Sequence, residues 1–543
     1  MRRHNKTDGR RKLIIGINQM TNLQASGDNN FGWRKFLPVV AGVLLIYLLY
    51  PTKNFYWDGI YFSSIIEDAP ALDVSLLHPN HLFYNVVGYL AYQAAHLFGW
   101  QIRAVYLLEF VSSLFSAASA IVFFFILKRL LKSNYLSFVL TLLFAFSATW
   151  WKFSTDADAY IPCVFFLLIA FYLLLPNQPP RPLLVALAHT AAMFLHELAV
   201  LFFFIAVLGI IFQTASLERR RRILLILQYG LTAFLLTFGT FCLSFYISAG
   251  TFDLKRFAAW MTSYSPENGF SFDAWRNLTL TLRGNFRLFV DGRFNFFELD
   301  LLNAILAIIL GAAFVGLIIK IWRSFGDLKM VWRTIIKPEF YRHPATLLCA
   351  TWILTYTIFL FFFIPANTFY RLLYLPAFII LFGWLLASSG VLQKSIRQWR
   401  TALLVAVVAL ANFLFFIRPY SQVRPETPLS LALELNQQWS GKTVVYYESL
   451  NSDNRLIRYF NPATVWKPLK AEMTADDFAL ELRTASQNGE TVWVETSALD
   501  RLESRPELAR QIAGIFDAAA RVELINRAHR LKFARLALPP VGD

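Results

Sequence analysis

A series of long apolar segments constrains this sequence more than any other feature. A helix that crosses the bilayer needs about 20 apolar residues, and fewer where neighbouring helices shield its ends. The composition agrees, because 57% of the residues are hydrophobic and only 16% are charged, as is typical of membrane proteins. We therefore expect a polytopic α-helical membrane protein with about 11 transmembrane helices. The candidate spans are roughly 36–50, 104–127, 135–151, 160–175, 183–196, 198–213, 223–248, 301–322, 345–364, 371–389 and 401–417.

Basic residues gather in short clusters beside these spans. Cytoplasmic loops carry an excess of Lys and Arg, so we interpret the clusters as cytoplasmic anchors. The formal net charge of +16 is then a topology signal and does not indicate a nucleic-acid partner. We expect a multi-pass protein of the inner (plasma) membrane with a cytoplasmic N-terminus. The clusters are Arg2, Arg3, Arg10, Arg11 and Lys12; Lys128, Arg129 and Lys132; Arg219 to Arg222; and Lys394, Arg397 and Arg400.

One further run of near-spanning length, 81–100, carries two histidines and two amide side chains. If this run crossed the membrane, the basic cluster at 128–132 would face outward and the later clusters would invert with it. We therefore interpret the run as a re-entrant or interfacial helix. This topology places residues 1–35 in the cytoplasm and residues 419–543 outside the cell membrane.

The outward tail 419–543 has a different composition from the rest of the chain. A strand-like segment at 443–449 is followed by a helical one at 474–489, a second strand at 490–496 and an amphipathic stretch at 502–536. Alternation of strand and helix predicts a small extracytoplasmic α/β domain. The predicted domains are thus a cytoplasmic segment 1–35, a transmembrane domain 36–418 with outward loops 51–103 and 249–300, and the α/β domain 419–543.

The sequence shows no cysteine-based site and none of several common motifs. Cys163, Cys242 and Cys349 all fall inside apolar segments, so they predict neither a disulfide framework nor a Cys-based zinc site, and we interpret them as packing residues. We find no glycine-rich phosphate loop, internal repeat or heptad array.

The loop after the first span carries acids and histidines beside the membrane. Ionisable groups at membrane depth are costly, so such a cluster is a functional hypothesis by default. Asp58 lies just past the first span, where a carboxylate can act as general base on an incoming hydroxyl; the alternative is a cap for the helix that begins beside it. His78 and His81, in "HPNH", are expected to contact phosphate or hydroxyl groups, or else to pack or cap. Their spacing alone is weak evidence for a metal pair.

A second acidic turn, "STDADAY", places Asp156 and Asp158 on either side of one alanine at the head of a span. Such a pair can hold a hard divalent cation that neutralises phosphate charge. It can equally supply an N-cap and a first-turn acid at a helix start. In the first loop, Asp68 and Asp73 flank Pro70, which suggests turn and cap roles. Direct chemistry is the alternative for these two acids and for Glu67 beside them.

Three more polar residues are predicted at the outward face. His196 and Glu197 lie at the hinge between two short spans, and burial in so apolar a setting would be costly unless they faced a wet cavity. Arg371 opens the tenth predicted span and is a fixed cation suited to clamping a phosphate. Its alternative role is snorkelling to lipid headgroups.

The layout of the chain resembles the integral-membrane glycosyltransferases of the GT-C superfamily. The shared order is a first span, an outward loop with an early acid, "HP" opening a polar interfacial helix, a span ending in "LKRLLK", and a second acidic turn. The pattern is most similar to protein O-mannosyltransferases and to the family of bacterial lipid A aminoarabinose transferases. The resemblance covers roughly 36–420, is strongest over 55–215, and finds no match for the tail.

This resemblance implies a mechanism in outline. A sugar on a polyprenyl phosphate is presented from the outer leaflet, and a loop carboxylate activates the hydroxyl of a glycan, lipid or protein acceptor for inverting displacement. Asp58 takes the base role by position. Arg371, with one or more of Lys152, His78 and His81, is expected to contact the donor phosphate.

Two other classes of function stay open from the sequence. A transporter or flippase of lipid-linked sugars would need charged or helix-breaking features near the bilayer midplane, preferably in matched halves. A non-catalytic scaffold of envelope glycan synthesis is the third class. The polar cluster at one face and the absence of a sequence repeat favour the enzyme.

Overall fold

A computed structural model describes most of the chain from residue 33 onward. The described residues form two compact units, each built from two stretches of sequence. The first, called here the membrane unit, comprises Met1–Pro51 and Ile65–Pro419, and the second, the tail unit, comprises Thr52–Ser64 and Tyr420–Asp543. The residues described are 33–176, 178–263, 269–292, 301–322, 325–391, 395–424, 427–439, 442–447, 452–469, 473–495, 522–525 and 532–536.

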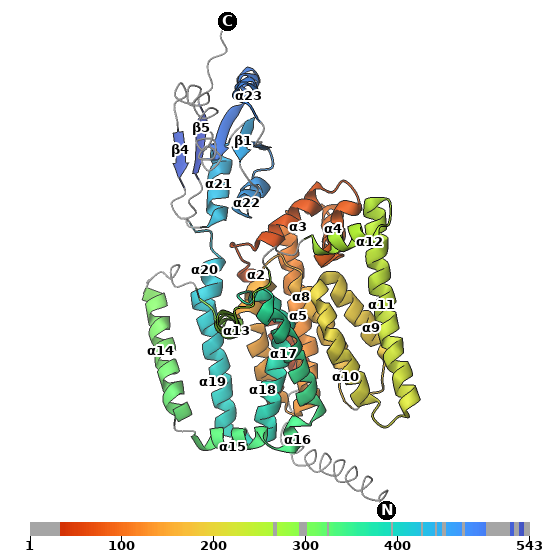
Figure 1. Ribbon diagram of the computed structural model, residues 1–543. Helices are drawn as coiled ribbons and strands as arrows, with labels where there is room; N and C mark the ends of the chain where they lie inside the picture. Colours follow the sequence, from red (N-terminus) through yellow and green to blue (C-terminus); the bar gives the residue numbers. More distant parts are fainter. Residues whose placement is uncertain are drawn as a thin grey trace, which may run out of the picture. The chain divides into compact units, whose positions relative to one another are not determined.

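Helices make up the membrane unit, and several of them stand side by side (Figure 1). Within the described ranges, four helices are long and apolar enough to cross a membrane, and a bent pair raises the number to five. Six shorter apolar helices of 10–17 residues accompany them. A helical membrane architecture is thus confirmed, whereas the expected number of about 11 spans is not reached by helix length and composition. The main helices are α2 (Trp33–Leu49), α5 (Ala104–Leu131), α6 (Asn134–Ala145), α7 (Ala148–Ser154), α8 (Tyr160–Leu173), α9 (Pro182–Leu195), α10 (Phe203–Gln213), α11 (Arg219–Ala249), α14 (Leu301–Trp322), α17 (Pro344–Phe362), α18 (Leu375–Ser389) and α19 (Ser395–Asn412).

The predicted span 135–151 is broken in two. Helices α6 and α7 meet at an angle of 66°, because Ser147 between them is extended (φ −65°, ψ 142°) and interrupts the helical hydrogen bonds. Serines of α5 hold the broken end in place. Ser113 Oγ donates to Ser154 O at 2.8 Å, and the indole of Trp150 donates to Ser116 Oγ at 2.8 Å. The break therefore fixes the acidic turn that follows α7.

The first predicted loop, 51–103, folds into short helices, namely α3 (Trp57–Asp68), η1 (Val74–Leu76), η2 (Pro79–His81) and α4 (Tyr84–Leu97). At 1.5 Å per residue, α4 is about 21 Å long, short of the roughly 30 Å hydrocarbon core. This agrees with an interfacial role for the run 81–100.

The second predicted loop, 249–300, also contains helices. They are α12 (Leu254–Thr262) and α13 (Ala274–Phe289), while residues 264–268 and 293–300 lie outside the described part. The segment before α13 is tied to the end of α17, since Ser271 N donates to Phe362 O and Ile364 N to Gly269 O, each at 2.8 Å. Short helices α15 (Phe325–Ile335), α16 (Pro338–Tyr341), η3 (Glu197–Phe202) and η5 (Phe369–Leu373) complete the connections.

The tail unit contains a five-stranded mixed sheet of strand order β2-β1-β3-β5-β4. Strand β1 pairs in parallel with β2 and β3, whereas β5 is antiparallel to β3 and β4. The predicted strands at 443–449 and 490–496 and the helix at 474–489 are confirmed as β1, β3 and α23. Of the stretch 502–536, residues 502–521 and 526–531 lie outside the described part, and the rest forms β4 and β5. The elements are α21 (Pro428–Gln438), β1 (Thr443–Tyr447), α22 (Ser452–Phe460), β2 (Val465–Pro468), α23 (Ala475–Gln487), β3 (Thr491–Glu495), β4 (Val522–Ile525) and β5 (Lys532–Leu536).

The start of the first predicted loop packs within the tail unit, which the sequence did not predict. Lys53 N donates to Tyr420 O at 2.6 Å. The rings of Phe55 and Phe460 are 5.9 Å apart, and the guanidinium of Arg455 lies 5.0 Å from the ring centroid of Tyr61. Aromatic contacts therefore join residues 52–64 to a helix about 400 positions later in the chain.

Candidate functional site

Four aromatic side chains from distant parts of the membrane unit meet in a group that we call the aromatic hub: Phe153, Tyr160, Phe369 and Tyr370. The ring of Tyr160 lies 5.8 Å from Phe153, 5.1 Å from Phe369 and 5.7 Å from Tyr370 between centroids. The contact of Phe153 with Phe369, at 5.6 Å, closes the group. Of the predicted site residues of the membrane unit, His81 and His196 contact Tyr160, whereas His78 contacts His81 and Glu197 follows His196 in the chain. The others, Lys152, Asp156, Asp158 and Arg371, lie in the same two chain segments as the hub residues.

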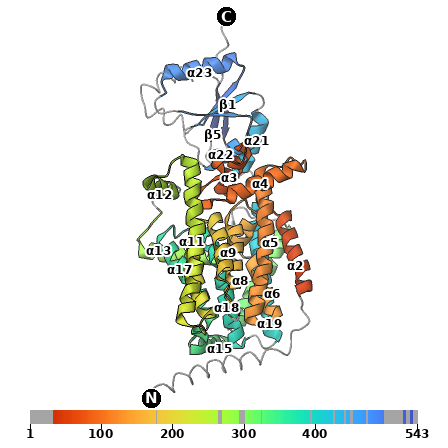
Figure 2. The same ribbon diagram turned by 90° about the vertical axis from the view of Figure 1, so that its right-hand side faces the viewer.

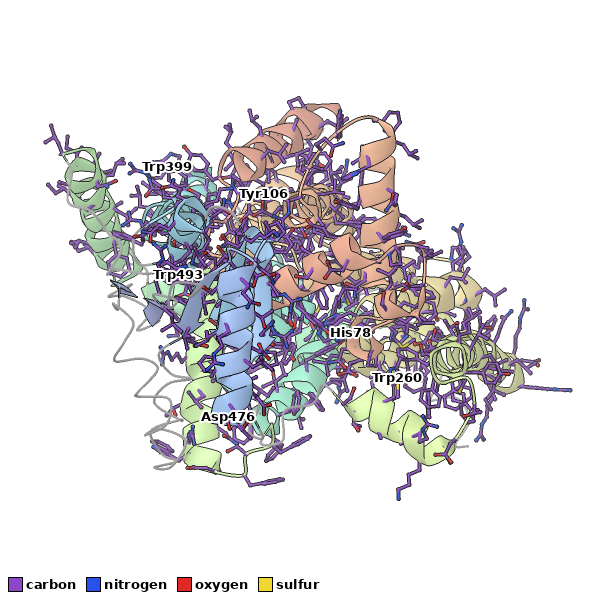
Figure 3. The ribbon with its side chains drawn as sticks, turned by 90° about the horizontal axis from the view of Figure 1, so that it is seen from above. His78, Tyr106, Trp260, Trp399, Asp476 and Trp493 are labelled. Atoms are coloured by element: carbon purple, nitrogen blue, oxygen red, sulfur yellow. The ribbon has the colours of Figure 1, made fainter. Side chains whose placement is uncertain are left out.

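Three predicted histidines form a cluster on one side of the hub. The ring centroids of His81 and His196 are 4.8 Å apart, and those of His78 and His81 are 5.7 Å apart. His196 contacts Tyr160 at 4.7 Å and Tyr370 at 5.5 Å. Figure 3, a view from above, shows His78 with Trp260 of α12 to one side; α12 packs against η2, the turn that holds His81. The structure thus brings together histidines that the sequence placed in two separate segments.

Hydrogen bonds fix the orientation of two of these rings. His81 Nδ1 donates to Leu195 O at 2.8 Å, because a carbonyl oxygen can only accept. His196 Nδ1 instead accepts the N–H of Leu198 at 3.1 Å, so its proton is on Nε2 when the ring is neutral. That Nε2 is buried and has no acceptor among the residues that the structure describes. The cluster therefore offers an N–H donor to an oxygen atom of a bound molecule.

Burial keeps the two loop histidines neutral. It lowers the pKa of His78 to about 3, with a smaller contribution from neighbouring His81. It lowers the pKa of His81 to about 4, partly offset by the hydrogen bond to Leu195. At neutral pH these side chains are therefore hydrogen-bonding groups and not cations, so any phosphate contact they make is a neutral one.

We expect acid to destabilise the fold through these histidines. Their folded pKa values lie below the usual 6.5, so the unfolded chain binds more protons and stability falls as the pH drops from about 6.5 toward 4. The melting temperature of the purified protein, measured between pH 7.5 and 4.5, should fall less steeply in a His78→Gln/His81→Gln variant. An unchanged slope in that variant would show that other groups carry the dependence.

The acidic turn holds a buried ion pair. Lys152 Nζ pairs with Asp156 Oδ2 across one helical turn, and the Asp156 side chain is 0% exposed. Asp156 Oδ1 also accepts the N–H of Ala157 at 2.9 Å. Asp158 Oδ1 accepts the N–H of Ala159 at 2.6 Å at the start of α8. The two acids thus have different partners, a lysine and a helix N-terminus.

The described residues show no metal-binding geometry that supports the predicted divalent cation. Within the described ranges, no three or more His, Cys, Asp or Glu side chains are grouped so that they could hold a metal ion. Asp156 and Asp158 as metal ligands stay a prediction. Cys163, Cys242 and Cys349 are free thiols, in keeping with the packing role expected of them.

Removing the charge of Asp156 should destabilise the protein strongly. Asp156→Asn keeps an acceptor for Ala157 but leaves the Lys152 ammonium buried without its counter-charge, and breaking one side of a buried pair costs about 3 to 5 kcal/mol. Thermal or denaturant unfolding in detergent would measure the loss. The double variant Lys152→Met/Asp156→Leu should regain most of it. Wild-type stability in Asp156→Asn would contradict a structural ion pair.

Arg371 lies in η5 and is fully buried. Its Nε donates to Asn367 O at 3.0 Å, its Nη2 to Pro365 O at 2.7 Å and its Nη1 to Tyr374 Oη at 2.7 Å. These bonds use three of the five guanidinium N–H groups. Snorkelling to lipid headgroups is therefore excluded, and α18 begins four residues later than the predicted span.

The charge of Arg371 has no counter-ion in the described part of the chain. A buried charge is costly unless it is paired, so this environment favours an anion. Helix α13 covers the guanidinium on another side: a Cβ at Gly284 would lie 3.0 Å from Arg371 Cζ, and Tyr374 Oη donates to Asn285 Oδ1 at 2.7 Å. No sequence signal pointed to Gly284 and Asn285, which lie in the predicted loop 249–300.

Other candidate acids have structural partners. Glu67 accepts the N–H of Ala104 at 2.7 Å and pairs with Arg103 at 2.9 Å, so it caps α5. Asp73 caps η1 by accepting the N–H of Ser75 at 2.8 Å. Glu197 begins η3 and is half-buried. The predicted cap role is thus observed for Asp73, and Glu67 has a cap role that was not predicted.

Asp58 lies in the first turn of α3 and is half-buried. A carboxylate there is favoured by the positive end of the helix dipole. The segment 52–64 that contains Asp58 belongs to the tail unit, whereas His78 and Asp156 belong to the membrane unit. The base role of Asp58 therefore stays a prediction.

No protein-family model matches the sequence, and no curated protein matches it. The fold is nevertheless similar to that of ArnT from Cupriavidus metallidurans. For the crystal structure of ArnT bound to undecaprenyl phosphate, the TM-score is 0.59 at 12% identity, over 92% of this chain and 97% of ArnT. For the apo state it is 0.56 at 10% identity, with the same coverage. The predicted resemblance is thus confirmed at the level of the fold, as a structural similarity to ArnT.

Proposed function

We propose that this protein is a membrane glycosyltransferase that moves a sugar from a polyprenyl-phosphate donor to an acceptor hydroxyl at the outer face of the cytoplasmic membrane. The observation that carries the proposal is the aromatic hub, beside which lie a histidine cluster, a buried Lys–Asp pair and a buried arginine that has no counter-ion among the described residues. It occurs in a chain with the fold of ArnT, which has been crystallised with undecaprenyl phosphate.

The donor phosphate is held, in this proposal, by the cationic side of the hub. Arg371 has two N–H groups left for phosphate oxygens and a charge that an anion would neutralise. Lys152 adds a second positive group, whose Nζ lies 5.6 Å from the Phe153 ring centroid. The Nε2–H of His196 supplies a neutral donor. Tyr160 and Tyr370 present aromatic surface of the kind that stacks on sugar rings.

The transfer step is an inverting displacement. Asp58 takes the proton of the acceptor hydroxyl, the oxygen forms a bond to the anomeric carbon of the sugar, and the bond from that carbon to the phosphate oxygen breaks. The leaving polyprenyl phosphate keeps the electron pair, and Arg371 and Lys152 stabilise its added negative charge. The acceptor is a glycan, a lipid or a protein.

Ligand binding tests the phosphate part of this proposal. The purified protein in detergent should bind undecaprenyl phosphate saturably, and undecaprenol, which has the same chain without the charge, should compete poorly. A matched Arg181→Gln variant, which removes an exposed arginine just before α9, should bind normally. Equal binding of undecaprenol and undecaprenyl phosphate would contradict a phosphate site.

The outward position of the tail unit can be tested by labelling. Thr484 is exposed on α23, so a Thr484→Cys substitution in a Cys242→Ala background should react with a membrane-impermeant maleimide when the outer side of the inner membrane is accessible. The two remaining cysteines, Cys163 and Cys349, are buried. Labelling that appears only after the inner membrane is broken would reverse the topology.

A further inference from the structure

Helix α13 carries an apolar stripe that faces away from the protein. The stripe consists of Trp275, Leu278, Leu282 and Phe286, whose exposed fractions are 75%, 41%, 62% and 67%. Their spacing of three, four and four residues places all four on one side of the helix. Phe272, just before the helix, is 80% exposed and extends the stripe.

The buried side of α13 is mostly polar, although it also includes Leu288, which is 0% exposed. Asn277 is 0% exposed and Thr281 is 5% exposed, and Gly284 and Asn285 adjoin Arg371 and Tyr374. Asn277 Oδ1 and Thr281 Oγ1 have no hydrogen-bond partner in the described part of the chain. A helix on the surface of a water-soluble protein has the opposite arrangement, with its apolar stripe toward the core.

A third side of α13 is exposed and basic. Arg276, Thr279 and Arg283 are exposed, and at 100° per residue they lie together, next to the apolar stripe. The surface of α13 therefore combines a row of large apolar side chains with two adjacent guanidinium groups. This pairing matches lipid, whose acyl chains are apolar and whose phosphate headgroups are anionic.

The location of α13 agrees with contact to lipid. It runs crosswise to the upright helices and lies below α12 in both Figure 1 and Figure 2. Helix α13 packs against α17, a candidate membrane span whose Leu354 and Ile358 are 57% and 60% exposed. The ring of Phe272 contacts that of Phe362 at the end of α17, at 5.8 Å. The apolar stripe thus continues the lipid-facing surface of a spanning helix.

We infer that α13 is an interfacial membrane helix: its apolar stripe lies against lipid acyl chains, Arg276 and Arg283 face lipid phosphates, and its polar side closes the protein around Arg371. Part of the predicted outward loop 249–300 then packs on the membrane unit and covers Arg371. The inference depends on the membrane location of the chain and not on its proposed transferase activity.

Spin labels on two faces of the same helix test this inference. Leu282→Cys, on the stripe, and Thr279→Cys, on the basic side, are prepared in the Cys242→Ala background. The labelled proteins are reconstituted in nanodiscs of phosphatidylcholine and phosphatidylglycerol. The collision rates of each label with oxygen, which concentrates in acyl chains, and with a water-soluble nickel chelate are then measured. Ile358→Cys on α17 serves as the lipid-facing control, and Leu480→Cys, exposed on α23 in the tail unit, serves as the water-facing one.

The label at Leu282 should resemble that at Ile358, with an oxygen-to-nickel ratio severalfold above that at Thr279 and Leu480. A ratio at Leu282 equal to that at Leu480 would show the stripe in water and overturn the inference. Low collision rates with both reagents at Leu282, together with spin–spin broadening, would show a second copy of the chain covering the stripe and would also overturn it.

Discussion

Asp58→Asn should lower turnover by about 10²- to 10⁴-fold, the usual contribution of a positioned general base, while donor binding and folding stay close to wild type. Asn keeps the size of the side chain and an acceptor oxygen but cannot take a proton at neutral pH. Asp58→Glu should recover little, because the added methylene moves the carboxylate by roughly 1 Å, and errors of that size are costly in catalysis. Single-turnover assays at saturating donor would measure the change.

Asp68→Asn is the matched control for this prediction. Asp68 is exposed at the far end of the same helix, so its loss should leave turnover unchanged. Wild-type turnover in folded Asp58→Asn protein would remove Asp58 from the base role. Loss of folded protein in the same variant would support the alternative role, in which Asp58 stabilises the start of α3.

Arg371→Lys should weaken the binding of undecaprenyl phosphate by about 10- to 100-fold, since hydrogen bonds to charged groups contribute roughly 1.5 to 3 kcal/mol each. The charge is kept, but an ammonium cannot reach Asn367 O, Pro365 O and Tyr374 Oη together in the planar arrangement of a guanidinium. Direct titration of the purified protein with the lipid gives the affinity. A parallel melting curve gives the stability change that follows from disturbing a buried side chain.

Arg181→Lys controls for the substitution itself, because Arg181 is an exposed arginine just before α9. Its effect on donor affinity should be small. If Arg371→Lys and Arg371→Ala both melt as the wild type does and bind undecaprenyl phosphate with unchanged affinity, Arg371 has no part in the donor site.

The elements that the sequence predicted well are those with a strong local signal. The apolar segments, the strands β1 and β3 and the helix α23, with its Thr474–Asp477 capping box, all follow from patterns within about 20 residues. The break within the predicted span 135–151 was not predicted, because hydropathy does not register the extended Ser147 between α6 and α7. Apolar residues continue through that break, and only the backbone direction changes.

The candidate site depends on contacts that no local pattern contains. His81 and His196 were predicted separately, and nothing in either segment indicated that their rings lie 4.8 Å apart. The polar inner side of α13 was also missed, because an amphipathic segment in an outward loop suggests a solvent-facing helix. Charge patterns identified Lys152, Asp156 and Arg371 as unusual, but their partners, a buried carboxylate and backbone carbonyls, required the fold.

Mass analysis of polyprenyl-linked sugars and surface glycans tests the proposed transferase activity most directly. The comparison uses cells with the wild-type protein, cells without it, and cells that carry Asp58→Asn or the control Asp68→Asn. We predict that a polyprenyl-phosphate sugar accumulates, and that one surface glycan, lipid or protein loses the mass of that sugar, both in cells without the protein and in Asp58→Asn cells. Wild-type protein and Asp68→Asn should restore both species. Identical donor and product masses in cells with and without the protein would contradict the proposed activity.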